Sequence, residues 1–259
     1  DPAERFAAGG PVRPGAMFAG RDPLIRNQVV VREGGNDQSE RAVALGLKWL
    51  AKHQFADGRW SLRRFDEAGD CDGRCGHTGT NSDTSATALG VLPFLGAGYT
   101  HLQGGYRDVV QQALDWLVAD QLEDGGFRSI GSGRMYAHGQ AAIALCEAYA
   151  MTRDRTLLSP AQRAVDYIVR AQHSAGGWRY TPRQFGDLSV TGWELMALRS
   201  AKTAYLNVPD ETLRRVDRFL DEVQTSPDIA TFGYLPGDGA TAAMTAEGML
   251  CRQYGGWKA

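Results

Sequence analysis

Two thiols and an imidazole lie within one short polar stretch of the sequence, CDGRCGH. Cys71, Cys75 and His77 are all ligands for a soft or borderline metal ion, and a four-residue step between cysteines falls within the range seen in zinc sites. No second pair of such ligands follows nearby, so we expect no cofactor and no tightly held metal. If zinc is bound, we expect a cysteine of this loop among its ligands. A Cys71–Cys75 disulfide, which export would favour, and two free thiols are the competing interpretations.

A carboxylate and a second imidazole precede Ala- and Leu-rich stretches that resemble helices. Aligning these stretches on their Ala-Leu cores places Asp83, His138 and Thr191 near the starts of successive helices, and predicts that they face one rim of a cavity. There Asp83 and His138 are candidate catalytic residues, or a partial site for a divalent ion. The competing interpretation is structural: Asp83 would cap its helix together with Ser82, and His138 would hydrogen-bond at a helix start.

These candidates belong to helix pairs that repeat at intervals of about fifty residues, a period that suits two helices and a generous loop. In each repeat an amphipathic helix is followed by a loop with the pattern Gln-x3-Gly-x-aromatic. Three copies are clear, and a fourth copy, after Gln224, is degenerate. We expect the glutamine to bond backbone groups of the neighbouring repeat, the glycine to permit the reversal, and the aromatic ring to pack on the preceding helix. The clear copies are Gln54, Gly58, Trp60; Gln121, Gly125, Phe127; and Gln172, Gly176, Trp178.

A second helix follows each loop and is rich in Ala, Gly and Thr. Small residues allow close helix packing, so the pattern predicts an inner layer of these helices inside an outer layer that carries the larger Trp and Leu side chains. Pro93 should kink or end the first inner helix. Capping signals predict the starts of three outer helices at Asp37 with Glu40, at Ser159-Pro160 and at Pro209-Asp210-Glu211.

Composition excludes several classes of partner. The chain has 259 residues, 43% of them hydrophobic, and a net charge of −2 with scattered Lys and Arg, which favours neither nucleic acid nor an anionic membrane. No apolar run approaches the roughly 20 residues that span a bilayer, so no transmembrane segment is expected. Residues 1–36 are predicted to form an arm around one short element at 24–31, and residues 37–259 one repeat domain. The localisation stays open, export included.

The loop residues carry a family resemblance. The three copies of Gln-x3-Gly-x-aromatic look like the QW motifs of the α/α-toroid superfamily, which includes squalene-hopene and oxidosqualene cyclases and protein prenyltransferase β subunits. The resemblance covers about residues 38–257. It implies an all-α toroid, a barrel of helix-pair repeats. Family toroids usually have five to seven pairs, so the four pairs expected here imply an incomplete ring.

The same resemblance bears on chemistry. In prenyltransferase β subunits an Asp-x-Cys pair and a histidine on the following inner helix hold zinc; Asp83 and His138 match two of these ligands, but Ser85 occupies the cysteine position. The DxDD motif of cyclases that protonate an alkene is absent, and so is the DDxxD motif of those that ionise a diphosphate.

The leading hypothesis is therefore a terpenoid-cyclase-like or prenyltransferase-like domain that holds an apolar, isoprenoid-type ligand in a central cavity. Whether the chain is an enzyme stays open. The alternative is a non-catalytic repeat scaffold that binds a protein or a glycan. Aromatic and polar side chains on the inner helices are the expected ligand contacts, because π faces suit apolar chains and cations alike. They are Phe94, Tyr136, Thr191 and Trp193.

Overall fold

The computed structural model describes residues 16–69, 71, 73–76, 79–128, 133–226 and 229–256. Within this part the fold is all-α, with one small antiparallel sheet. The elements are η1 (Ala16–Arg21), α2 (Pro23–Arg32), α3 (Asp37–Lys52), η2 (Phe65–Glu67), α4 (Asp83–Gly96), α5 (Arg107–Asp120), α6 (Arg134–Thr152), α7 (Arg155–Ala171), α8 (Leu188–Thr203), α9 (Asp210–Val223), β1 (Gln224–Ser226), β2 (Ile229–Phe232) and α10 (Ala242–Tyr254).

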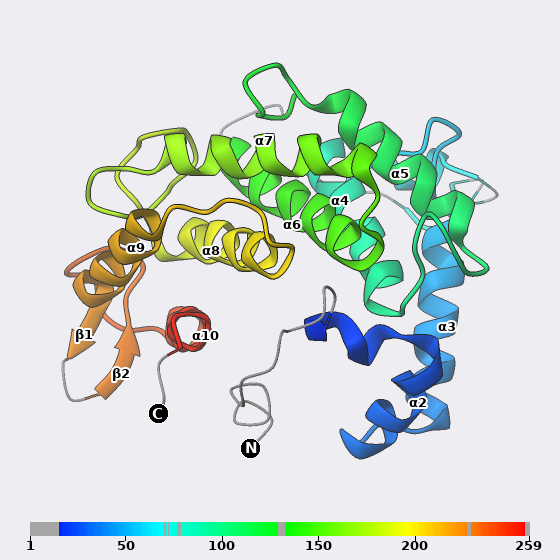
Figure 1. Cartoon of the computed structure of the whole chain (residues 1–259), viewed down its shortest axis with the longest axis horizontal. Helices are drawn as coiled ribbons and strands as arrows, with labels where there is room; N and C mark the ends of the chain where they lie inside the picture. Colours follow the sequence, from blue (N-terminus) through cyan, green and yellow to red (C-terminus); the bar gives the residue numbers. More distant parts are fainter. Residues whose placement is uncertain are drawn as a thin grey trace.

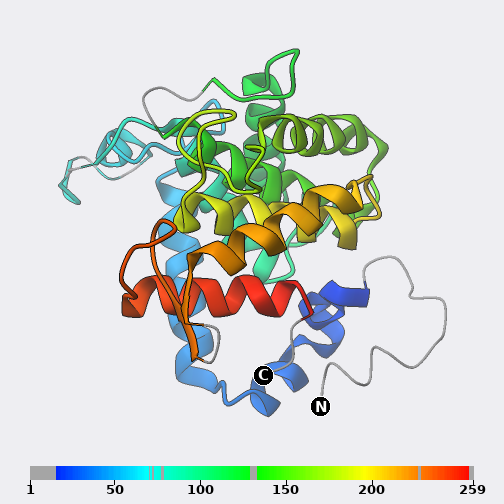
Figure 2. The ribbon, with the colours of Figure 1, turned by 90° about the vertical axis from the view of Figure 1, so that its left-hand side faces the viewer.

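The helices form two nested layers in an open arc (Figure 1). The outer layer contains α3, α5, α7 and α9, and each is followed in the chain by its inner partner. The inner helices α4, α6, α8 and α10 pack successively against one another, as their small residues predicted. Seen from the side, α8, α9 and α10 lie together at the end of the arc with the two strands beside them (Figure 2).

Helix starts differ from the predicted ones in two places. Asn36, not Asp37, caps α3, and it forms the capping box with Ser39 rather than with a glutamate. The helix α7 begins at Arg155, ahead of Pro160, because Asp154 accepts a hydrogen bond from the backbone of Thr156 and adds a turn. The predicted start at Pro209 is confirmed for α9.

Pro93 does not end α4, since the helix runs on to Gly96. A proline this close to the C-terminus removes only one late backbone hydrogen bond.

The glutamine of each clear loop joins two consecutive repeats, as predicted. Its side-chain Nε2 donates to the carbonyl of the loop glycine and to a carbonyl at the start of the next outer helix. For Gln121 these distances are 3.2 Å to Gly125 and 3.0 Å to Pro160. The other pairs are Gln54 with Gly58 and Val109, and Gln172 with Gly176 and Thr212.

The loop glycines are required both by conformation and by space. Gly125 has a φ of +86°, and a Cβ on it would lie 2.2 Å from the carbonyl oxygen of Arg163 in the next outer helix. Gly58 and Gly176 make the same approach to Gln112 and Arg215. The motif therefore fixes how closely one repeat can pack on the next.

Each loop tryptophan is held by its own helix pair. The indole Nε1 of Trp178 donates to the carbonyl of Ile168 on the preceding outer helix, and its backbone N–H donates to Thr191 Oγ1 on the following inner helix. Trp60 makes the same contacts with Leu50 and Thr87. In the degenerate fourth copy, the buried Phe232 occupies the position of the loop tryptophan. Its backbone N–H donates to Oγ1 of Thr245, as that of Trp178 does to Thr191.

The N-terminal arm contacts the first helices, although residues 1–15 lie outside the described part. The predicted element at 24–31 is confirmed as α2. Arg26 of α2 forms an ion pair with Glu40 of α3, and Arg21 of η1 forms one of 2.7 Å with Glu147 of α6. The arm thus bridges an outer helix and an inner helix of different repeats.

Candidate functional site

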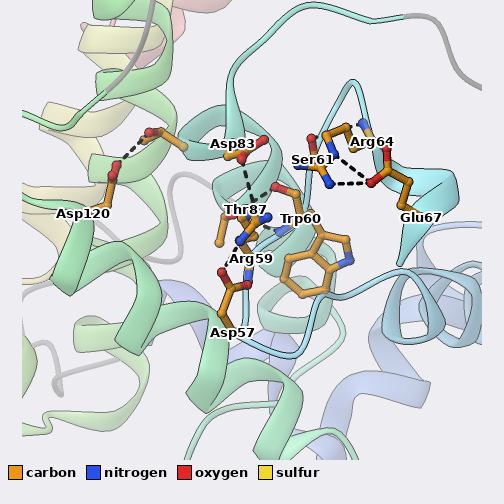
Figure 3. A network of polar contacts seen from close by, with 10 residues as sticks. Asp57, Arg59, Trp60, Ser61, Arg64, Glu67, Asp83, Thr87 and Asp120 are labelled. Atoms are coloured by element: carbon orange, nitrogen blue, oxygen red, sulfur yellow. Dashed lines mark hydrogen bonds and ion pairs between the residues drawn. The ribbon is translucent and has the colours of Figure 1, made fainter. Parts of the chain in front are cut away.

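Asp83 lies at the start of α4 in a network of charges (Figure 3). Its carboxylate is 3.2 Å from Nε of Arg59, which also pairs with Asp57. On the other side, Thr84 donates a 2.7 Å hydrogen bond to the buried carboxylate of Asp120. Asp83, Thr84 and Asp120 line a small pocket of about 140 Å³. The rest of its wall consists of Asn81, Ser82, Trp116 and Arg128. Burial, and to a smaller degree the charge of Asp83, raises the pKa of Asp120.

The structure does not bring His138 to this pocket. The imidazole is fully buried between the rings of Phe127 and Tyr167, and its Nε2–H donates a 3.0 Å hydrogen bond to the carbonyl of Ala164 on α7. Burial lowers its pKa to about 4. Asp83 and His138 therefore have separate partners, and the expectation that they share a rim is wrong. With Ser85 in place of the cysteine, the residues of this chain do not fit a prenyltransferase-type zinc site.

A four-residue error in register explains the failed alignment. Thr87 and Thr191 hold the loop tryptophans in the same way, so they are the equivalent positions in α4 and α8. Asp83 precedes Thr87 by four residues, just as Asp187 precedes Thr191. The structural counterpart of Asp83 is therefore Asp187, which was not predicted from the sequence. The spacing of four from a threonine was the signal that could have found it.

Asp187 caps α8 and is fully buried with both oxygens engaged. Oδ1 accepts from Val190 N–H and from the Ser189 hydroxyl, and Oδ2 accepts a 2.9 Å hydrogen bond from Tyr234. Arg179 forms an ion pair of 3.4 Å with the same oxygen. With three hydrogen bonds and an ion pair on its carboxylate, Asp187 ties the loop after β2 to the start of α8.

Two further carboxyls on the inner helices lack this support. Neither oxygen of the fully buried Glu194 has a hydrogen-bond partner, and burial raises its pKa well above the ordinary value. Burial and the charge of Asp187 raise the pKa of Glu247 to about 7. Glu194 therefore favours the neutral form, which suits the close packing of α6 and α8, whereas Glu247 changes its charge near neutral pH.

The predicted ligand contacts fall into different environments. Phe94 is fully buried between Trp60 and Tyr106, and Thr191 is fully buried where it holds Trp178. Tyr136 is half-buried with its hydroxyl bonded to Ser189, which makes it a neighbour of the Asp187 network. Trp193 is half-buried and packs on α6, where a Cβ at Gly139 would approach its side chain to 3.1 Å. The structure does not gather these four side chains in one place.

An apolar pocket of about 350 Å³ lies between α3, α4 and the first loop. Aromatic rings from three elements form much of its wall: Trp49 on α3, Trp60 in the loop and Phe65 on η2. His53 is the one ionisable side chain among its lining residues. The remaining wall consists of Leu50, Ser61, Leu62, Ala86, Leu89 and Gly90.

Beside this pocket, Cys71 and Cys75 approach a histidine that was not predicted as their partner. The thiols are not joined in a disulfide, and Nε2 of His53 is 3.3 Å from Sγ of Cys75. One ligand atom from each of the three residues lies within 4.8 Å of the other two. His77, the predicted third ligand, lies outside the described residues. His53 is the C-cap residue of α3, and no local sequence pattern marked it as a partner of the two cysteines.

No protein-family model and no curated protein matches the sequence, so the family resemblance rests on the loop residues themselves. In the described part of the chain, no helix is both long and apolar enough to cross a bilayer.

Proposed function

We propose that this chain is an α/α-toroid repeat domain of the terpenoid cyclase and prenyltransferase kind that binds an apolar, isoprenoid-type ligand. The observation that carries the proposal is the aromatic pocket between α3 and α4. Its volume of about 350 Å³ falls at the lower end of the range of ligand sites, which suits a short isoprenoid chain better than a large polycyclic one.

The nested arc of helix pairs and the loops that join them support the fold part of the proposal. The lining of the pocket supports the ligand class. Trp49 and Leu89 expose 43% and 38% of their surface beside the buried Trp60, so a ligand there would cover apolar area now in contact with water. The lining contains no carboxylate, so the proposal concerns binding and assigns no protonation step to this pocket.

Calorimetric titration with farnesol tests the proposal. We expect wild-type protein to bind farnesol, and Leu89→Trp, which fills the pocket, to bind it at least about tenfold more weakly, a loss of about 1.4 kcal/mol. Leu102→Trp is the matched control, because Leu102 is 55% exposed and lies outside the pocket. Absence of farnesol binding to the wild type, or equal binding by Leu89→Trp, contradicts the proposal and favours the scaffold alternative.

A further inference from the structure

We infer that His53, Cys71 and Cys75 form a site for a borderline transition-metal ion, zinc above all. Two thiolates and one imidazole are the ligand types that zinc prefers, and the three-residue spacer between the cysteines is within the usual range for zinc sites. This site is distinct from the Asp83 and His138 positions. It shares His53 with the neighbouring pocket, whereas neither cysteine lines that pocket.

The hydrogen bond on the far side of His53 prepares its ring for a metal. Nδ1 lies 2.7 Å from the carbonyl oxygen of Trp49, and a carbonyl can only accept, so Nδ1 carries the hydrogen. The lone pair is therefore on Nε2, the nitrogen that faces Cys75. Such a backbone partner for the second nitrogen is the usual way in which proteins fix the tautomer and orientation of a metal-bound histidine. Stacking on Trp49, with ring centroids 3.9 Å apart, holds the plane of the ring.

The cysteine loop is packed against the end of α3, which brings both thiols to the histidine. Gly69 has a φ of +55°, and a Cβ there would lie 1.8 Å from the carbonyl oxygen of Lys52, so only glycine permits this approach. Turn hydrogen bonds from Gly73 to Asp66 and from Arg74 to Cys71 then fold the loop back on itself. These contacts hold the cysteine loop beside the end of α3.

The distances suit tetrahedral coordination after a small contraction. Ligand atoms around a tetrahedral zinc stand roughly 3.5–3.8 Å apart, given Zn–S and Zn–N distances of about 2.3 and 2.0 Å. The three atoms lie within 4.8 Å of one another, so closure requires movements of about 1 Å or less. His53 and Cys71 are buried and Cys75 is exposed, which leaves an approach for the ion from solvent. Three ligands from the described residues leave one position of the tetrahedron for water or another donor.

Titration of the reduced, metal-stripped protein with Co²⁺, followed by displacement with Zn²⁺, tests the inference. We expect one cobalt per chain, with thiolate-to-cobalt charge-transfer absorption and the d–d intensity of a tetrahedral site. His53→Ala, Cys71→Ser and Cys75→Ser should each weaken binding at least about a hundredfold, since loss of an outer partner alone commonly costs 10–100-fold. His173→Ala and Cys251→Ala are controls that remove a histidine and a cysteine elsewhere, and both should bind like the wild type.

Two results would overturn the inference: no cobalt–thiolate absorption from fully reduced wild-type protein, or undiminished binding by Cys75→Ser. Cys75→Ser is the decisive variant because the exposed thiol contributes little to packing, and circular dichroism will show that the variant is folded. Binding that appears only after reduction supports the site and identifies a Cys71–Cys75 disulfide as its oxidised form. Farnesol titration of Cys71→Ser and Cys75→Ser, whose thiols do not line the proposed ligand pocket, keeps this result separate from the proposed function.

Discussion

Burial holds the imidazole of His138 in its neutral form, because its pKa falls to about 4 from an ordinary 6.5. In the unfolded chain the same group is protonated below about pH 6.5, so the unfolded state binds more protons between the two values. Stability therefore rises with pH across this window and is lost as the pH falls from 6.5 toward 4. The full effect of this one group is about 3 kcal/mol.

His138→Thr tests this sign by replacing the imidazole with a polar side chain that does not titrate in this range. We expect the free energy of unfolding of the variant to depend less on pH between 4 and 6.5 than that of the wild type, whatever its absolute stability. Urea unfolding at several pH values measures the slope. Parallel slopes for wild type and His138→Thr would show that the imidazole is not kept neutral by burial.

The contacts of a residue were predicted well where its type has few structural roles, and poorly where its type has many. The loop glutamines, glycines and tryptophans each meet a specific demand for a donor, a positive φ or a large ring, so their positions predicted their contacts. Asp83 and His138 did not behave this way, because a carboxylate can pair with any nearby arginine and an imidazole can be buried. His53 was missed because its approach to Cys75 depends on how the loop folds back, which no local pattern encodes.

At the scale of the repeat, the loop glycines set the distance between consecutive outer helices. We expect Gly125→Ala to destabilise the protein by about 3 kcal/mol or more, because alanine tolerates the φ of +86° poorly and its Cβ would meet the Arg163 carbonyl at 2.2 Å. Thermal or denaturant unfolding measures the loss. A change of less than about 1 kcal/mol would mean that the repeats can separate without cost.

Gly46→Ala is the matched control for a glycine that no such contact requires. Gly46 lies within α3 and has no positive φ, and a Cβ added to it would meet no atom within 4 Å beyond its own helix backbone. Alanine there should stabilise the protein by about 0.5–1 kcal/mol, because it restricts the unfolded chain and favours helix. Opposite signs for the two substitutions separate a steric requirement from a general preference.

The helix pairs were predictable, but the register between inner helices was not. Apolar periodicity and capping residues give helix positions to within a turn, as the early start of α7 illustrates. Ala, Gly and Leu recur at so many spacings along the inner helices that an alignment on them can slip by four residues, one helical turn, without penalty. The threonines that hold the loop aromatic residues fix the true register, and their hydrogen bonds show which positions are equivalent.

At the scale of the whole molecule, burial is distributed unevenly along the arc. The inner helix α6 lies between α4 and α8 and has buried residues along nearly its whole length, whereas Leu47 is the one buried residue of α3. The last inner helix, α10, buries only Gly248 and Cys251. Repeat proteins gain stability from the interfaces between neighbours, so elements with one neighbour should open more readily than elements with two.

Hydrogen exchange under native conditions tests this gradient directly. We expect amides of α6 and α8 to exchange only through global unfolding, and those of α3 and α10 to exchange through local opening that requires at least about 2 kcal/mol less. Gln121→Ala sharpens the test, because it removes the hydrogen bond from the second loop to Pro160 of α7. This variant should lower protection in α5 and α7 before it affects α9. Equal protection from α3 to α10 would instead make the arc a single cooperative unit in which the loops contribute no separable coupling.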